Sequence, residues 1–174
     1  MAGLRTLSAG SINDVRVERL AKDLGVTKGS FYWHFQDRPA LLSAMLEAWV
    51  RIDTEQIIEF VDAHPASVDP VAALEQLVRV AMAGPAEFDG VEGGIRDWSA
   101  NDEQAAALCS EIDSRRLTYV TDLLTAAGVD HRTAVARAGI IYRIIIGEYN
   151  WRRYGGEPAD VDEMVLVARM LAAP

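Results

Sequence analysis

The sequence predicts an all-α fold, in which a helix-turn-helix precedes a longer helical body. Apolar residues recur three and four positions apart along most of the 174 residues, which is the period of amphipathic helices. Turn-forming residues divide this pattern into helical segments, most clearly at Gly25, Gly84-Pro85, Gly128 and Gly155-Gly156. Because 50% of the residues are hydrophobic, the chain is globular and not disordered.

The chain begins with a short helical segment. Ala2–Ser8 predicts a helix that stops near Gly10, and Ser11–Val15 links it to the next helix. Arg16 stands at the front of that next helix, where its guanidinium group can contact a DNA phosphate. The alternative is a solvated charge, and the phosphate contact is slightly favoured.

Residues 17–35 carry the helix-turn-helix pattern. Apolar residues at positions 17, 20, 21 and 24 form one helical stripe, and Gly25 follows where a helix end favours a left-handed residue. Thr27 is placed to cap the next helix, Lys28–Phe35, which buries the phenylalanines at 31 and 35. In a helix-turn-helix, the second helix enters the DNA major groove.

The outward side of this second helix has an unusual composition for a solvated surface. Its Lys, Ser, Tyr and His side chains can donate to phosphate oxygens, and lysine can also contact guanine edges. The alternative is that the two large aromatic residues simply pack on the rest of the chain, and residue types alone leave the two interpretations even. The set is Lys28, Ser30, Tyr32, Trp33 and His34.

A third helix should connect this unit to the body. Asp37 is placed to cap it, and Pro39 falls in its first turn, where the missing N–H does little harm. Arg38 at a helix start opposes the usual charge preference, which is easier to understand if it meets a phosphate. The apolar stripe from Leu41 to Ile52 makes this helix the natural lever between a ligand and DNA.

The stretch GVTKGSFYWHFQDRPALL resembles the TetR (tetracycline-repressor) family of transcriptional regulators. The resemblance covers about the first quarter to third of the chain, and it is specific because many positions agree in order and spacing. Compared with the family pattern, the first helix lacks its beginning. The matching positions are Gly25, Val26, Thr27, Gly29, Phe31, Tyr32, His34, Phe35, Arg38, Leu41 and Leu42.

The resemblance implies a cytoplasmic regulator that binds double-stranded operator DNA as a homodimer, with repression favoured over activation. It implies a helix-turn-helix domain over residues 1–48 and an effector-binding and dimerisation domain over residues 49–174. It also implies an unknown small-molecule effector that releases the DNA. The expected DNA-binding residues are Arg16, Thr27, Lys28, Gly29, Ser30, Tyr32, Trp33, His34 and Arg38.

The body is predicted to contain further helices. The apolar stripe of the connecting helix continues to His64-Pro65, and a capped helix begins at Asp69-Pro70. Residues 87–101 contain three glycines, so a connector is favoured there over a helix or the mouth of a pocket. Long helices follow over residues 102–127, 132–154 and 162–171.

The penultimate helix indicates a dimer. Ile140, Ile141 and Ile144–Ile146 cannot share one helical face, so the helix should be buried on more than one side. One side then meets the body and another meets a second copy. We therefore expect a homodimer through residues 132–172, which agrees with how TetR-like proteins pair.

Net charge is unevenly distributed. The chain carries −9 overall, but residues 1–50 hold six basic and five acidic residues, which gives about +1. Of the 17 basic and 26 acidic residues, 11 and 21 remain for residues 51–174, or −10. DNA can approach only the N-terminal part without strong repulsion, and specific binding should be salt-sensitive.

The residues that could carry chemistry are scattered. One cysteine, Cys109, excludes an internal disulfide and fits a reducing cytoplasm. The first ten residues lack the apolar core of a signal peptide, and no apolar run is long enough for a membrane span. His34, His64 and His131 lie too far apart for a metal motif. No catalytic set can be nominated, so we expect neither an enzyme nor a cofactor.

An effector pocket would lie in the helical body. An apolar or aromatic ligand is compatible with the candidate lining residues, although core or surface positions are the simpler interpretation for each of them. Two arginines could act as polar anchors. The candidates are Met82, Trp98, Cys109, Tyr119 and Tyr142, with Arg96 or Arg116 as anchor.

Two other classes of function compete with a regulator. The first is a helical small-molecule-binding or protein-interaction module that has lost specific DNA binding, which the short first helix and the weak positive charge favour. The second is a small helical enzyme, which ranks last because no catalytic set is present.

Overall fold

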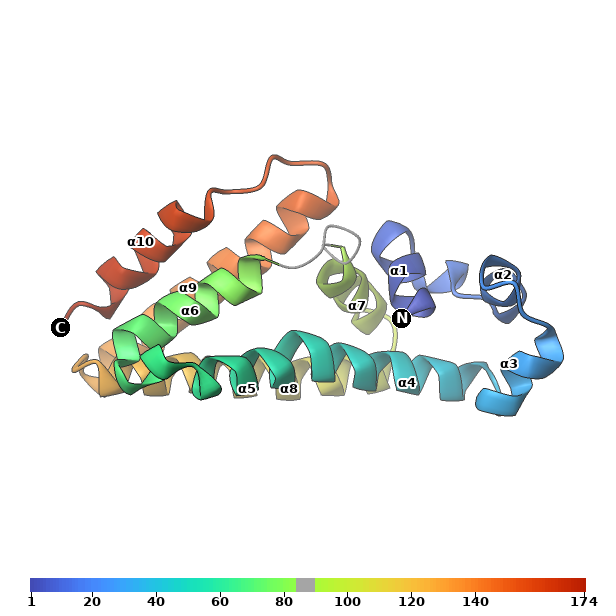
Figure 1. Ribbon diagram of the computed structural model, residues 1–174, viewed down its shortest axis with the longest axis horizontal. Helices are drawn as coiled ribbons and strands as arrows, with labels where there is room; N and C mark the ends of the chain where they lie inside the picture. The colour runs from blue at the N-terminus through green and yellow to red at the C-terminus, as the bar shows by residue number, and fades with distance from the viewer. Residues whose placement is uncertain (84–89) are drawn as a thin grey trace.

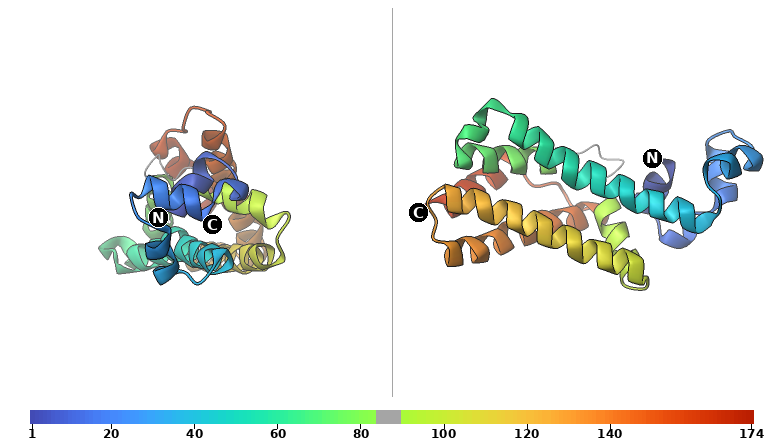
Figure 2. Two further views of the ribbon diagram at one scale, coloured as in Figure 1. Left: turned by 90° about the vertical axis from the view of Figure 1, so that its right-hand side faces the viewer. Right: turned by 90° about the horizontal axis from the view of Figure 1, so that it is seen from below.

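The computed structural model describes residues 1–83 and 90–174, and in these residues it contains helices and no strands. Figures 1 and 2 show an elongated molecule, with α2 and α3 at one end and the body of α6, α8, α9 and α10 at the other. The α-helices are α1 (Ala2–Ala9), α2 (Val17–Asp23), α3 (Lys28–His34), α4 (Arg38–Val50), α5 (Gln56–Ala63), α6 (Pro70–Met82), α7 (Val91–Ser99), α8 (Glu103–Ala126), α9 (His131–Arg153) and α10 (Val161–Ala172). The all-α prediction is confirmed.

The helix-turn-helix forms where the sequence predicts it. Gly25 adopts a φ of 67°, the left-handed conformation that ends α2. The Thr27 side chain accepts a hydrogen bond from the Ser30 N–H at 3.1 Å, which caps α3. Asp37 caps α4 in the same way through the Ala40 N–H at 2.8 Å. Local backbone and side-chain chemistry therefore sets the end of α2 and the starts of α3 and α4.

Two apolar cores stabilise the fold. The first joins α1, α2 and α4 to α7 and the start of α8, and it includes Leu7, Phe31, Trp49, Ile95 and Ile112. The second lies among α5, α6, α8, α9 and α10. The first core crosses residue 48, the expected domain boundary, because that boundary falls within α4.

Helix α7 corrects one expectation from the sequence. A connector was favoured over residues 87–101, but residues 91–99 form a helix; residues 84–89 lie outside the described part. A Cβ on Gly94 would lie 2.7 Å from Leu7 Cγ, and one on Gly90 would meet the backbone oxygen of Ser8. A Cβ on Gly93 would lie 2.8 Å from Arg153 Cδ. The glycines thus let α1 and α9 approach α7 closely.

The rod formed by α4 and α5 contains one wide turn. Residues Arg51–Glu55 form a π-helical segment, η2, in which the Gln56 N–H bonds to the Arg51 carbonyl oxygen. Such insertions change the direction of the side chains that follow and often occur at functional sites. Here the segment carries Asp53 and Thr54, which line a cavity described below.

No helix in residues 1–83 and 90–174 is long and apolar enough to cross a membrane.

The close contact of α7 with α1 predicts that replacing a glycine of α7 by alanine destabilises the protein, although alanine is the better helix former. Gly94→Ala should lower the free energy of unfolding by about 1–3 kcal/mol, because the new methyl group meets Leu7 and its backbone oxygen. Gly29→Ala in α3 is the control, since a Cβ there meets only Thr27 Oγ1 at 3.7 Å. That control should be neutral or slightly stabilising, as alanine is in helices. Urea unfolding of both variants measures the difference, and equal effects would contradict the packing described.

Candidate DNA-binding surface and ligand cavity

The predicted outward residues of α3 form one exposed surface. Trp33 is 82% exposed and Tyr32 is 52% exposed, so Trp33 does not pack on the rest of the chain. The Tyr32 ring has an edge contact with Phe31, at 5.5 Å between ring centroids. Lys28, Gly29, Ser30 and His34 are also exposed, whereas Phe31 is buried. Figure 2 shows that α3 lies at the extreme end of the molecule, where it is accessible to a large partner.

The basic residues of this surface already have partners within the chain. Lys28 Nζ lies 3.0 Å from Glu18 Oε1, and both side chains are exposed. Such a surface pair contributes little stability, so DNA could replace Glu18 at small cost. Arg16 Nε donates to the Asn13 carbonyl oxygen at 3.0 Å.

Arg38 has a structural role that the sequence did not indicate. Its Nε donates to the Val15 carbonyl oxygen at 3.0 Å, and its Nη2 donates to the Ile12 carbonyl oxygen at 2.8 Å. The side chain therefore fixes the link between α1 and α2 against the start of α4. A phosphate contact by Arg38 would have to use its remaining N–H groups.

A cavity lies among η2, α5, α6, α8 and α9. Its volume is about 60 Å³. Its apolar lining residues are Ile57, Ile58, Leu77, Ala81, Val120, Ile145 and Ile146, and its polar ones are Asp53, Thr54, Arg116, Tyr119, Tyr142 and Tyr149.

The predicted pocket residues divide into two groups. Arg116, Tyr119 and Tyr142 line the cavity, and Arg96 lies next to it through a 2.8 Å hydrogen bond to the Tyr142 hydroxyl oxygen. The lining does not include Met82, Trp98 or Cys109.

These three residues pack in the apolar cores and do not face the cavity. Trp98 and Cys109 are buried in the first core, and Met82 is buried in the second. Sequence reasoning missed Asp53, Thr54 and Tyr149. The first two reach the cavity from the π-helical segment, which has no signal in the sequence, and Tyr149 lies on the predicted apolar helix α9.

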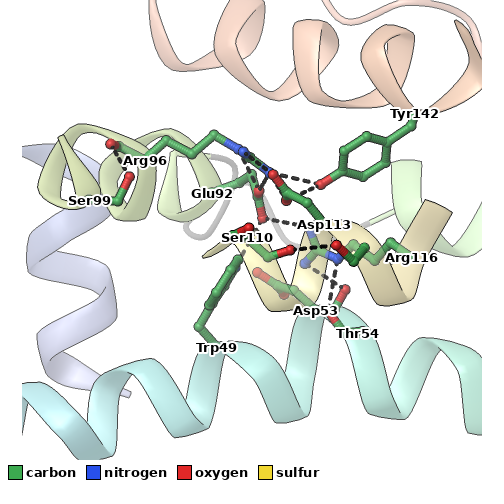
Figure 3. A network of polar contacts seen from close by, with 11 residues as sticks. Trp49, Asp53, Thr54, Glu92, Arg96, Ser99, Ser110, Asp113, Arg116 and Tyr142 are labelled. Atoms are coloured by element: carbon green, nitrogen blue, oxygen red, sulfur yellow. Dashed lines mark hydrogen bonds and ion pairs between the residues drawn. The ribbon is translucent and has the colours of Figure 1, made fainter. Parts of the chain in front are cut away.

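A buried carboxylate links the cavity to helix α4, as Figure 3 shows. Glu92 on α7 is 3% exposed. Its Oε2 accepts from Trp49 Nε1 at 3.0 Å and from Arg116 Nη1 at 3.1 Å, and its Oε1 accepts from Arg96 Nε at 2.8 Å. The Arg116 guanidinium group also lies 5.2 Å from the centroid of the Trp49 ring. Residues of α4, α7 and α8 thus share one charged centre.

A second carboxylate extends this network to α9. Asp113 accepts from Arg96 Nη1 and Nη2 at 3.1 and 2.8 Å, and from the Tyr142 hydroxyl at 2.6 Å. Burial alone would raise the pKa of Asp113, but these hydrogen bonds hold it below its usual value. Burial raises the pKa of Tyr142 to about 12, so its hydroxyl group stays protonated and donates a hydrogen bond to Asp113.

The carboxyl group of Asp53 differs from both of these. It lines the cavity and makes no hydrogen bond or ion pair within the described residues, although the Asp53 backbone oxygen accepts from Arg116 Nη2 at 3.2 Å. The pKa of Asp53 is raised to about 7, mainly by burial and also by the charge of Glu92, while the charge of Arg116 opposes the rise. Among residues 1–83 and 90–174, no cluster of three His, Cys, Asp or Glu side chains could hold a metal ion.

Residues 1–45 match the family model for bacterial regulatory proteins of the tetR family, which confirms the resemblance seen in the sequence. The HTH-type transcriptional regulator AcrR of Shigella flexneri is 31% identical over 75 residues, 43% of this chain and 34% of the relative. Tetracycline repressor protein class G of Vibrio anguillarum is 40% identical over 50 residues, 29% of this chain and 24% of the relative. The chain therefore matches about a third or less of these relatives' length.

Solved structures share the whole fold. A protein from Rhodococcus sp. that is assigned to the TetR-family regulators has a TM-score of 0.69 and 17% identity, covering 98% of this chain and 95% of its own. A second such protein, from Mesorhizobium loti MAFF303099, has a TM-score of 0.66 and 19% identity, covering 98% and 89%. At this identity the similarity establishes the arrangement of helices.

Asp53 should make the stability of the protein depend on pH. Its pKa is raised from 3.8 to about 7 on folding, so the folded state holds the proton more tightly. Stability should therefore fall as the pH rises between these values, by up to about 4 kcal/mol, and then stay constant. The side chain in Asp53→Asn cannot ionise. The free energy of unfolding of this variant, relative to that of the parent, should therefore increase from pH 5 to pH 8 in urea unfolding.

The exposed residue Asp122 on α8 supplies the control for this experiment. The effect of Asp122→Asn gives the baseline at each pH for replacing an exposed carboxyl group by an amide. If the effect of Asp53→Asn did not change with pH beyond this baseline, the raised pKa of Asp53 would be contradicted.

Proposed function

Because residues 1–45 carry the TetR-family domain, we propose that this chain is a DNA-binding transcription regulator that responds to a small molecule. Each subunit of a dimer inserts α3 into one of two successive major grooves of a near-palindromic operator. Repression is favoured over activation by the family resemblance alone. In this proposal the protein acts in the cytoplasm by binding DNA and a ligand, and it is not an enzyme.

The observation that carries the proposal is the exposed surface of α3. Trp33 is 82% exposed on a short capped helix at the end of the molecule, where folding alone would favour a polar residue. Thr27, Lys28, Gly29, Ser30, Tyr32, Trp33 and His34 are proposed to contact the DNA, with Arg16 and Arg38 at phosphates flanking them. The two arginines also hold the surrounding backbone in place.

Dimerisation is proposed to occur through the last two helices, within residues 132–172. Helix α9 exposes Val135, Ile140 and Trp151 to solvent in the single chain. Helix α10 similarly exposes Leu166, Val167 and Met170. Large exposed apolar side chains on neighbouring surface helices are candidates for a protein interface. A second copy would cover these residues and set the distance between the two α3 helices.

The effector is proposed to bind in the cavity of the body. Arg116 lines this cavity and bonds to Glu92, which also accepts a hydrogen bond from Trp49 of α4. A ligand that moves Arg116 would change the hydrogen bonds of Glu92, which hold Trp49 of α4. Helix α4 directly follows α3 in the chain. The ligand shifts the regulator toward the released state only if it binds the two states with different affinities.

The proposed function predicts a specific, salt-sensitive DNA complex. The protein should bind DNA from upstream of its own gene more tightly than scrambled DNA, at two salt concentrations in a fluorescence anisotropy titration. Lys28→Ala and Trp33→Ala should each weaken specific binding by about tenfold or more, since each removes a base or phosphate contact. Arg115→Ala, which removes one exposed charge from α8, should not.

The outcome of this titration separates the two candidate functions. The proposal of a regulator would be rejected if the protein bound native and scrambled DNA equally, if higher salt abolished both, and if it selected no preferred sequence from a random DNA library. That result would leave the ligand-binding or interaction module as the better description.

The dimer can be tested independently of DNA. Ile140→Asp should convert the protein to a monomer in light scattering after gel filtration, because a charge would be buried at the proposed interface. Val68→Asp is the matched control, since Val68 is an apolar residue that is 92% exposed outside α9 and α10. The control should stay dimeric. A parent protein that is monomeric at micromolar concentration would contradict the proposed contact.

A further inference from the structure

We propose that the ligand of the body cavity is a hydrophobic amine, a compact molecule with one positive charge and an apolar or aromatic body. This inference rests on the proposed function, because it names the class of ligand for the same cavity. It follows from the lining of the cavity, the carboxyl group of Asp53 that has no partner among the described residues, the pairing of Arg116 with Glu92 and the local balance of charge.

The walls of the cavity require a ligand with an apolar body. Aliphatic side chains from α5, α6, α8 and α9 form most of the lining, among them Ile57, Leu77, Val120 and Ile145. Such a surface gains free energy when a hydrocarbon or aromatic group replaces water. The charged lining residues are Asp53 on η2 and Arg116 on α8, and Thr54 bonds to Arg116, so the polar end of a ligand should face these three residues.

Arg116 is poorly suited to bind an anionic ligand. Its Nε donates to Thr54 Oγ1 at 2.8 Å, its Nη1 to Glu92 and its Nη2 to the Asp53 backbone oxygen. Every nitrogen of the guanidinium group is therefore engaged. Its charge is already balanced by Glu92, so an anion would have to compete with that carboxylate for the guanidinium group.

Asp53 offers the opposite chemistry. Its carboxyl group opens onto the cavity and accepts no hydrogen bond from the described residues. Asp53 is half-buried, and a carboxylate that has lost part of its water is stabilised by donors or a cation. An ammonium group supplies both at once, through N–H donors and a positive charge.

The charges around the cavity leave room for one cation. Glu92 and Asp113 are paired with Arg96 and Arg116, two carboxylates with two guanidinium groups. Ionised Asp53 adds a third negative charge without a matching positive one. A monovalent cation restores neutrality to the cluster, whereas an anion would increase the imbalance to two charges.

The tyrosines of the cavity also favour a cation. The hydroxyl groups of Tyr119, Tyr142 and Tyr149 already donate to Asp62, Asp113 and the Ala81 carbonyl oxygen, each at 2.6 Å. These hydroxyl protons are therefore not available to a ligand. The aromatic rings remain, and their faces attract ammonium groups.

The test uses three probes that share a phenyl ring and differ in the charge of the head group. They are 2-phenylethylamine, which is a cation at neutral pH, neutral 2-phenylethanol and anionic 3-phenylpropionate. Affinities are measured by titration calorimetry on the full chain without DNA at pH 8. The amine should bind about tenfold or more tightly than the alcohol, because charged hydrogen bonds are the stronger ones, and the propionate should bind most weakly.

Asp53→Asn identifies the group responsible. This variant keeps the shape of the side chain, so it should bind the alcohol as the parent does but lose the preference for the amine. Asp122→Asn, at an exposed position on α8, should keep the preference. Thermal unfolding of each variant confirms that it is folded before the titration.

The pH dependence provides a second readout. In the parent, the preference for the amine should decline as the pH falls from 8 to 6, because a proton competes for Asp53, whose pKa is about 7. The charged and titratable groups that face Asp53 are Glu92, Arg116 and the phenol of Tyr149. The Asp53→Asn variant should show no such decline.

Several results would overturn the inference. These are equal affinity for the three probes, tighter binding of the propionate, no measurable binding of the amine, and an amine preference that survives Asp53→Asn. The DNA titration, carried out without probes, tests the proposed function separately. Amine binding without DNA binding would retain the ligand class and reject the regulator, and the reverse result would do the opposite.

Discussion

The buried carboxylate of Glu92 is the interaction on which the arrangement of helices depends. It is 3% exposed, and it is tolerated because Trp49, Arg96 and Arg116 all donate to it. A buried charge of this kind contributes little net stability, but loss of any one partner is costly. The carboxylate therefore acts less as a source of stability than as a constraint on geometry. Helices α4, α7 and α8 can satisfy it only in a narrow range of relative positions.

This constraint connects the cavity physically to the helix-turn-helix, although α6 and α9, which line the cavity, lie far from α3 in Figure 1. Arg116 reaches from the cavity to Glu92, and Trp49 reaches the same carboxylate from α4. On the other side of α7, Gly94 lies against Leu7 of α1. The first core thus includes both the support of α3 and one end of the polar network. Two contacts, one polar and one apolar, fix α7 between the two functional regions.

The sequence predicted what local chemistry determines. Gly25, Thr27 and Asp37 place the ends of helices through their own backbone and side-chain preferences, and the structure agrees. Helix α7 was missed because its glycines count against a helix unless the neighbours they accommodate are known. Asp53 was missed because nothing in the sequence signals the π-helical turn. The type of a residue such as Trp98 does not reveal which of two cores it joins, so the ligand cavity was predicted only in part.

The close packing of α1 on α7 limits how this protein could be divided into transferable domains. Transferring the first 48 residues onto another body would separate Leu7 and Ser8 from the glycines that accept them. It would also leave Trp49 on the other side of the junction from the helix that it helps to support. The helix-turn-helix is consequently not a self-contained cassette. A chimera that keeps these contacts has to carry α7 together with α1, as two non-adjacent pieces of a single module.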